Sequence, residues 1–249
     1  MFRKLLKIVG FLILMVFIIG TLAFTSHETK NIICRNIVID FNDEDIIQVN
    51  KDEILRLVNL ADNQILNKTL DQINSDIIEK EVEKHQAILN AEVYELITKD
   101  SSSYKGVLVV KVNHREPVVR IMSETGSYYL DKFGDKIPIS ANYTANVLVS
   151  TGYFTEKYAS EQLLPFILYV EKDEFWKAQI EQVHIEKDGD IILTPLVGGH
   201  FIELGKLDKY QEKLRNMKAF YEQVLAKNNW NKYSTVSLKY NNQVIAKRR

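Results

Sequence analysis

The chain has 249 residues, and 46% of them are apolar, which is enough for the cores of one or two domains. Its formal net charge of −1 argues against a nucleic-acid-binding protein, which would need a basic surface. The single cysteine, Cys34, excludes an internal disulfide framework and a thiolate zinc cluster, and no two of the five histidines have metal-ligand spacing.

The N-terminus predicts a membrane anchor. Residues 1–7 carry Arg3, Lys4 and Lys7, and residues 8–25 carry no charge. Eighteen helical residues rise roughly 27 Å, close to the thickness of the hydrocarbon layer. A cleaved signal peptide is the alternative, but the apolar run is long and no clear cleavage site follows it. We therefore expect an uncleaved helix over residues 8–25, with residues 1–7 in the cytoplasm and the rest of the chain outside.

The first segment outside the membrane shows a β-α-α-β-β order over residues 33–115. Residues 36–41 alternate as a strand does, and a capping-box-like pair at Asn50 and Glu53 begins a helix. Thr69 and Gln72 repeat that pattern and predict a longer second helix that reaches Val82. Strands over residues 91–98 and from Gly106 onward follow.

Two strands meet at Pro117. The apolar alternation that begins at Gly106 ends there, since proline donates no ladder hydrogen bond, and a second strand resumes at once over residues 118–122. We take residues Arg115, Glu116 and Pro117 as an interdomain junction. Because no glycine lies nearby, we expect this junction to be stiff, and solution scattering that shows freely rotating domains would contradict the expectation.

The second segment, residues 116–246, predicts a mainly antiparallel β domain with two helices. Short strands are expected near residues 128–130, 147–151 and 201–204, and a hairpin over residues 180–193 turns at Asp188-Gly189. Helices are expected over residues 163–170, with Pro165 in the first turn, and 207–227, whose apolar stripe should pack on the sheet. One last strand is expected over residues 235–246, followed by a basic tail at 247–249.

These features together resemble the FtsQ/DivIB family of bacterial cell-division proteins, which place a POTRA domain and a β domain after a membrane anchor. The resemblance is carried by Leu89–Tyr94, by Arg115-Glu116-Pro117-Val118, and by the Y-L-D-x-x-G pattern from Tyr129 to Gly134. The segment K-Y-x-N-x-V from Lys239 to Val244 is similar to the family's final strand, with Lys239 in place of the usual arginine. The overall expectation is an α+β protein.

No catalytic constellation emerges from the sequence. Asp188 and Asp190 are explained by hairpin geometry, and Gly198-Gly199-His200 lacks the context of a phosphate loop. His114, Arg115 and Glu116 lie in an extended segment, which sends successive side chains to opposite faces. Cys34 is expected to be an inert thiol. We predict a protein without enzymatic activity, cofactor, metal, small-molecule substrate or nucleic-acid partner.

The resemblance implies a scaffold of the division machinery at the septum of the bacterial inner membrane, with its body in the periplasm. In the family the last strand binds FtsB, which travels with FtsL. An exposed strand edge offers unpaired backbone groups to such a partner. By position, the expected contact residues are Tyr240, Asn241, Asn242, Gln243, Val244 and Ile245.

Two other functions remain open. A POTRA unit could serve an envelope transport or assembly complex, although the chain has no series of barrel strands. An anchored envelope hydrolase would need a deep cleft near His184 or His200.

Overall fold

The computed structural model describes residues 10–21, 32–42, 49–99, 104–124, 126–140, 143–227, 230–240 and 242–249. Residues 10–21 are helical, and the remainder of the predicted 8–25 anchor lies outside this range. None of the helices in the described part is long and apolar enough to cross a membrane. The described chain divides into two compact units, the first reaching Asn113 and the second beginning at His114.

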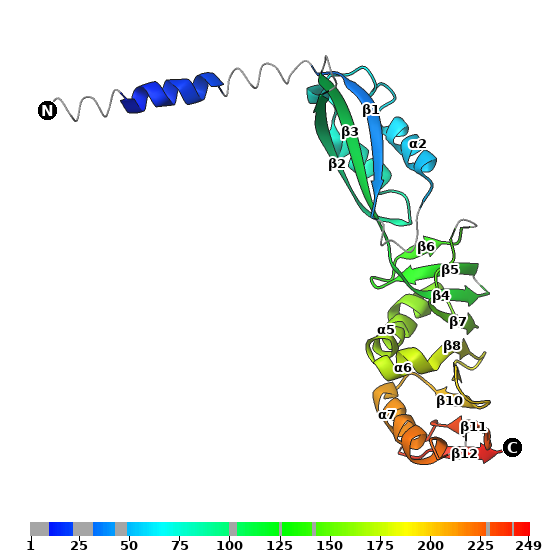
Figure 1. Cartoon of the computed structure of the whole chain (residues 1–249). Coiled ribbons are helices and arrows are strands. Elements are labelled where there is room, and N and C mark those ends of the chain that lie inside the picture. Colours follow the sequence, from blue (N-terminus) through cyan, green and yellow to red (C-terminus); the bar gives the residue numbers. More distant parts are fainter. Residues whose placement is uncertain are drawn as a thin grey trace. The chain divides into compact units, whose positions relative to one another are not determined.

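The first unit is a three-stranded sheet with helices on one face (Figure 1). Its sheet order is β1-β3-β2, and β1 and β3 run parallel. The element order confirms the predicted β-α-α-β-β arrangement. Its elements are β1 (Cys34–Phe41), α2 (Lys51–Ala61), the 3-10 turn η1 (Leu70–Gln72), α3 (Ser75–Val82), β2 (Ile88–Lys99) and β3 (Tyr104–His114).

The two helices of this unit begin differently. The Asn50 side chain accepts the Asp52 N–H at 3.0 Å, so the predicted start of α2 is confirmed. The predicted long helix from Thr69 is wrong, because the Thr69 side chain makes no cap hydrogen bond and only the short turn η1 follows it. Asn74 instead caps α3 by accepting the Ile77 N–H.

Helix α3 also protects part of an exposed edge. Strand β2 lies at the rim of the sheet, where unpaired backbone N–H groups invite pairing with other chains. The carboxylates of Glu83 and Glu79 accept the N–H groups of Ala91 and Val93, at 3.1 and 2.7 Å. The first half of β2 is therefore satisfied from within the unit.

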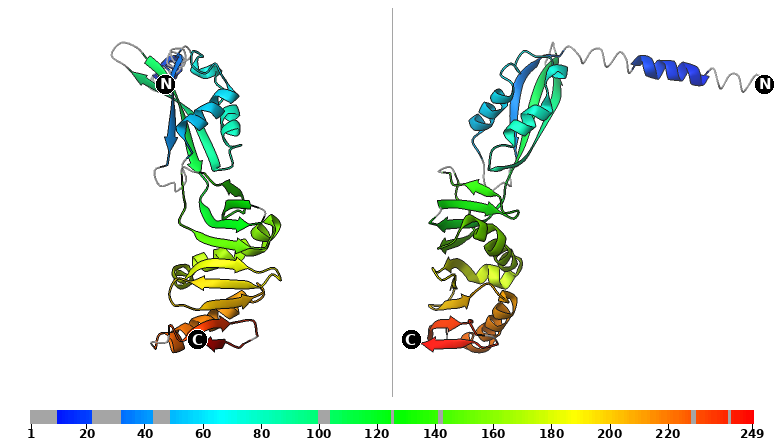
Figure 2. Two further views of the ribbon diagram at one scale, coloured as in Figure 1. Left: turned by 90° about the vertical axis from the view of Figure 1, so that its right-hand side faces the viewer. Right: turned by 180° about the vertical axis from the view of Figure 1, so that it is seen from behind.

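The second unit is a nine-stranded sheet of order β12-β11-β10-β9-β8-β7-β4-β5-β6, with helices against one face (Figure 2). Its strands are β4 (Pro117–Ser123), β5 (Gly126–Asp131), β6 (Lys136–Pro138), β7 (Leu148–Gly152), β8 (Ile180–Ile185), β9 (Ile191–Pro195), β10 (Phe201–Gly205), β11 (Tyr233–Ser237) and β12 (Ile245–Arg248).

This sheet is mixed. The pairs β4–β7, β7–β8 and β10–β11 are parallel, and the other five neighbouring pairs are antiparallel. Each parallel pair needs a crossover connection, and helices supply the crossovers after β7 and after β10. The prediction of an α+β protein is confirmed, and the expected mainly antiparallel sheet also contains this parallel part.

The helices differ in number and bounds from the expected two. The helical segments are α4 (Glu156–Tyr158), the π turn η2 (Ala159–Leu163), α5 (Leu164–Lys172), α6 (Glu174–Gln179), α7 (Tyr210–Phe220) and the π turn η3 (Tyr221–Leu225). Helix α6 was not expected; the Asp173 carboxylate starts it by accepting the N–H groups of Phe175 and Trp176.

Pro165 lies in the first turn of α5, as expected, but α5 continues an earlier helical run. The helical run already begins at Glu156, where the Thr155 hydroxyl caps it. The π turn η2 ends at Leu163, two residues before the proline, and the Leu164 N–H bonds the Ala159 carbonyl. The widened turn comes where proline could not donate an α-helical hydrogen bond.

The stripe predicted on the last helix packs on the sheet, as expected. Leu214, Met217, Tyr221 and Leu225 are buried in one core with residues of the sheet. The helix begins at Tyr210 instead of 207, since Lys209 has the left-handed φ of 48°. The predicted closing residues 228 and 229 lie outside the described part.

Candidate partner-binding edge

The C-terminus forms a hairpin, and the prediction of one strand over residues 235–246 is wrong. Strand β11 ends at Ser237, and β12 begins at Ile245 and runs back antiparallel to β11, with Ser237 opposite Ile245 and Val236 opposite Ala246. The sequence between them carries Asn242 at φ 57°, a left-handed conformation that asparagine tolerates and that a continuous strand excludes.

The predicted contact residues lie mainly in the connection between the two strands. Tyr240 is 61% exposed, and its carbonyl accepts the Gln243 N–H in a turn. Asn242 is exposed, and Asn241 lies outside the described residues. Val244 packs partly buried against the core. Of the five described residues among them, only Ile245 lies in a strand.

Strand β12 occupies the end of the sheet. It pairs with β11, and no other described strand lies on its far side. The Arg249 N–H bonds the Lys232 carbonyl, and the Ser234 hydroxyl donates to the Lys247 carbonyl, so residues 247 and 249 direct their backbone groups toward β11. Since these directions alternate along a strand, the backbone groups of Ala246 and Arg248 point away from the sheet.

The side chains of β12 alternate between two faces. Ala246 stands opposite the buried Val236 and packs on the core. Ile245 and Lys247 point to the face without helices. On that face Lys247 lies opposite Thr235 of β11, and Thr235 lies opposite Phe201 of β10. Phe201 is 53% exposed and Ile245 48%. An incoming strand would find the apolar side chain of Ile245 beside the unpaired backbone of β12.

The three basic residues at the C-terminus form part of this edge. Lys247 and Arg248, predicted as a basic tail, lie in β12. Arg249 follows, and its guanidinium donates to the carbonyl of Gly199. The basic tail was expected because charged side chains favour solvent. Lys247 and Arg248 are instead ordered because their backbone continues the pairing with β11 past Ala246.

Comparison with protein families decides the identity. A family model described as FtsQ/DivIB, C-terminal related, matches residues 116–247, more than half of the chain. The chain belongs to the FtsQ/DivIB family. A second model, described as a POTRA-like domain, matches residues 32–101. A search of curated proteins found no match.

In this FtsQ/DivIB-family protein an ion-pair cluster holds the chain where it leaves β11. Asp190, on the β8–β9 turn, lies 2.8 Å from the Lys239 ammonium and 3.1 Å from that of Lys206. The hydrogen bond from Lys239 lowers the pKa of Asp190, and the one from Lys206 adds to this effect. The Lys239–Asp190 bond in turn raises the pKa of Lys239. Lys239 immediately precedes Tyr240, so this cluster positions the start of the connection to β12.

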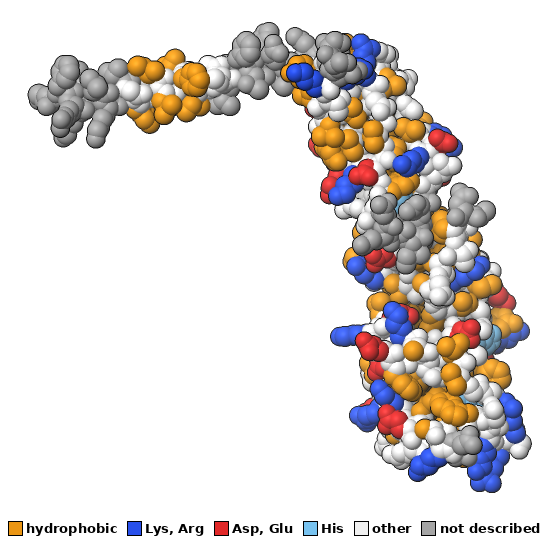
Figure 3. All heavy atoms as spheres, viewed as in Figure 1, with side chains coloured by type: hydrophobic (Ala, Val, Ile, Leu, Met, Phe, Trp, Pro, Cys, Tyr) orange, Lys and Arg blue, Asp and Glu red, His pale blue; other side chains and the backbone are white. Residues whose placement is uncertain are grey.

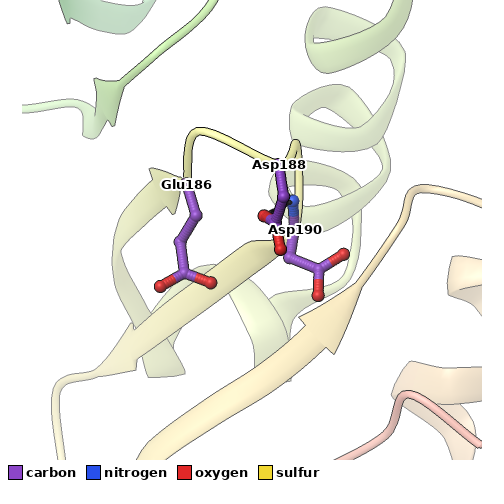
Figure 4. A group of neighbouring side chains, drawn as sticks. All are labelled: Glu186, Asp188 and Asp190. Atoms are coloured by element: carbon purple, nitrogen blue, oxygen red, sulfur yellow. Dashed lines mark hydrogen bonds between the residues drawn. The ribbon is translucent and has the colours of Figure 1, made fainter.

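Two of the acidic side chains at this turn, Asp188 and Asp190, have partners within the protein. Glu186, Asp188 and Asp190 lie at one turn (Figure 4) and are close enough to share a cation. The Asp188 carboxylate accepts the Asp190 N–H at 3.0 Å, as the tight-turn prediction requires, and Lys206 donates to the Asp188 carbonyl. Two lysines supply the positive charge at Asp190.

An aromatic cluster supports the terminal hairpin from the helical side. Tyr221 packs edge-to-face on Trp176, Trp230 and Phe175 with ring centroids 5.5–5.9 Å apart. Its hydroxyl lies 3.1 Å from His200 Nε2. Burial raises the pKa of Tyr221. The pKa of His200 is lowered mainly by burial and to a smaller extent by the positive charge of Arg249.

The two histidines do not form the cleft that a hydrolase needs. His200 is 2% exposed within the aromatic cluster. His184 lines an open hollow of about 450 Å³ with Tyr153 and Glu186, and its Nδ1 lies 2.8 Å from the Thr151 hydroxyl. In the described part of the chain, neither histidine faces a set of converging catalytic groups.

The junction residues have distinct environments in the second unit. Arg115 lies 2.7 Å from both Asp131 and Asp135, whereas Glu116 is exposed. Pro117 is buried and opens β4 opposite Asp131, which agrees with the predicted break between two strands. Sequence reasoning missed the partners of Arg115, although the Y-L-D-x-x-G pattern contains one of them.

Proposed function

We propose that this FtsQ/DivIB-family protein is a non-enzymatic, single-pass scaffold of the bacterial division machinery. Residues 8–25 anchor it in the inner membrane with residues 1–7 in the cytoplasm, and the two units act in the periplasm at the septum. The family match over residues 116–247 and the POTRA-like match over 32–101 support a division-related scaffold.

Strand pairing at β12 is the proposed means of recruitment. The observation that supports it is a terminal strand whose Ala246 and Arg248 backbone groups face away from the sheet. A small, single-pass, coiled-coil protein of the FtsB type, travelling with an FtsL-type protein, would add an extended segment to this edge. Ile245 would contact its side chains on the open face, and Tyr240 would lie beside it.

The structure changes the best test of this mechanism. In a single strand over residues 235–246, Val244→Pro would block pairing, but Val244 lies before β12 and is not on the free edge. Arg248→Pro removes an N–H that points away from β11, so it should leave the hairpin paired and abolish co-purification with the small partner. Arg248→Ala keeps the N–H and removes the same charge, so it should retain most of the binding.

Two outcomes are decisive. Equal binding by Arg248→Pro and Arg248→Ala, with both proteins folded by circular dichroism, would refute strand pairing at β12. Depletion of the protein in its host tests the wider proposal: filamentous cells are expected, and normal septation would reject a role in division.

A further inference from the structure

The charge of the chain is unevenly distributed, and cations gather at its last strands. Residues 223–249 contain six lysines and arginines and no aspartate or glutamate. Since the whole chain has 32 basic and 33 acidic residues, the remaining 26 basic residues face all 33 acidic ones in residues 1–222. Figure 3 shows Lys and Arg side chains at the end of the second unit where β11 and β12 lie. The β12 edge is therefore basic in a chain that is otherwise acidic.

The cations of β12 are available to a ligand. Lys247 and Arg248 are exposed, and neither takes part in any ion pair between the described residues. Lys239, in contrast, is paired with Asp190, and the Arg249 guanidinium donates to the Gly199 carbonyl. A carboxylate that approached Lys247 or Arg248 would not have to displace an acid of the protein.

The two free cations lie on opposite faces of the sheet. Lys247 stands opposite Thr235 on the face without helices, the same face as Ile245. Arg248 stands opposite Tyr233, which packs partly buried against the core on the helical side. An incoming strand would meet one cation on each face and an apolar side chain, 48% exposed, on the open face.

This pattern disfavours a second copy of the chain as the occupant of the edge. Two β12 strands that paired about a two-fold axis would bring Lys247 and Arg248 of one copy against the same residues of the other, and like charges across a strand pair are destabilising. Basic side chains at an edge protect against such pairing. The same charges attract a strand of opposite charge, for which the backbone groups of Ala246 and Arg248 are free.

We propose that the β12 edge selects an acidic strand with two consecutive aspartate or glutamate residues. In an antiparallel arrangement the first acid lies opposite Arg248, the second opposite Lys247, and an apolar residue two positions later lies opposite Ile245. Consecutive residues of a strand point to opposite faces, so each carboxylate reaches one cation. This inference rests on the strand pairing at β12 in the proposed function, and it names the chemistry of the segment that pairs there.

Hydrogen exchange of the full-length protein in lipid nanodiscs tests the selection with synthetic β-hairpins as probes. Three hairpins differ only at the two acidic positions, which hold two glutamates, two glutamines or two lysines. The glutamate hairpin should protect the peptide covering residues 244–249 with an affinity roughly fivefold higher than that of the glutamine hairpin, as expected for two exposed ion pairs, and the lysine hairpin should bind most weakly. Added salt should shrink this preference.

A single exposed ion pair contributes only about twofold to the affinity, so Arg248→Ala alone should still bind. Reversal of both charges is the sharper test. Lys247→Glu with Arg248→Glu leaves every backbone N–H in place and should make the lysine hairpin the preferred ligand. The matched control is Lys157→Glu with Lys172→Glu, the same change of charge on exposed lysines of α4 and α5. Helix α5 packs against β4, six strands from β12, so the control should keep the preference for glutamate.

Failure of the selection and failure of strand pairing would look different. Equal protection of residues 244–249 by all three hairpins would overturn the acidic selection and leave strand pairing at β12 intact. A preference for glutamate that survives the reversal of both charges would also overturn it. Protection by none of the hairpins would overturn the strand pairing of the proposed function, and the selection with it.

Discussion

The guanidinium of Arg115 lies 2.7 Å from a carboxylate oxygen of Asp131, a side chain that is 3% exposed. The other oxygen of Asp131 accepts the N–H groups of Phe133 and Asp135, each at 2.9 Å. Asp131 therefore organises the β5–β6 turn and at the same time holds Arg115, two residues before β4. Two sequence motifs, R-x-P-V and Y-L-D-x-x-G, join at this ion pair.

Arg115→Ala should destabilise the protein by roughly 2 kcal/mol, because it leaves a buried carboxylate without its charged partner. Chemical denaturation followed by circular dichroism would measure the loss. Glu116→Ala removes an exposed charge next to it and should change the free energy of unfolding by less than about 0.5 kcal/mol. Equal midpoints for the two variants would show that the Arg115 pair contributes nothing.

Lys239 and Asp190 should be energetically coupled by about 0.5–1 kcal/mol, a modest value because the Lys239 side chain is 35% exposed. A double-mutant cycle of Lys239→Ala and Asp190→Asn measures this coupling. If the proposed partner binds at β12, Lys239→Ala should also weaken that binding, since the start of residues 240–244 loses its attachment to Asp190, and Lys239→Arg should restore it. If the Lys239→Ala variant bound the proposed partner as well as the unmodified protein does, the ion-pair cluster would have no role in positioning the edge.

Gly152→Ala should be far more damaging than Gly126→Ala, although both glycines have positive φ, 118° and 130°. A Cβ at residue 152 would lie 2.0 Å from the Ile185 carbonyl oxygen, whereas nothing lies within 4 Å of the one at residue 126. Conformational strain costs each variant about 1–3 kcal/mol, and only Gly152→Ala adds the backbone clash between β7 and β8. Thermal unfolding would compare them, and similar melting temperatures would contradict this account.

Acidification should destabilise the protein through His200. Burial, and then the charge of Arg249, lowers the pKa of His200 below its ordinary value. The unfolded chain thus binds a proton more readily than the folded one, and the free energy of unfolding falls as pH drops below about 6.5, the unperturbed histidine value. The groups facing the ring are the Tyr221 hydroxyl and Arg249.

His200→Phe removes this titration. Its stability difference from the unmodified protein, measured by denaturation at several pH values, should therefore shrink as pH falls from 7 to 5. A difference that stays constant over this range would mean that His200 does not contribute to the pH dependence.

Much of the local structure could be predicted from the sequence. Asn50 caps α2 because its side chain meets a free N–H two residues on, the β8–β9 hairpin turns at Asp188-Gly189, and Pro117 begins a new strand. Each of these three features depends on groups within a few residues of one another in the sequence. Residue type and spacing are therefore enough to predict it. Other local patterns, among them Arg115-Glu116-Pro117-Val118 and the Y-L-D-x-x-G segment, supported the resemblance that the family match confirmed.

The candidate site depended on contacts distant in sequence. Residues 235–246 alternate well enough to suggest one strand, and only pairing of Ile245–Arg248 with β11, together with the attachment of Lys239 to Asp190, shows that the chain turns between them. Sequence alone determined the β-α-α-β-β order of the first unit, the turn of the β8–β9 hairpin and the β character of the C-terminal segment. Tertiary structure decided which residues form the free edge, because strand pairing brings together backbone groups that no local pattern encodes.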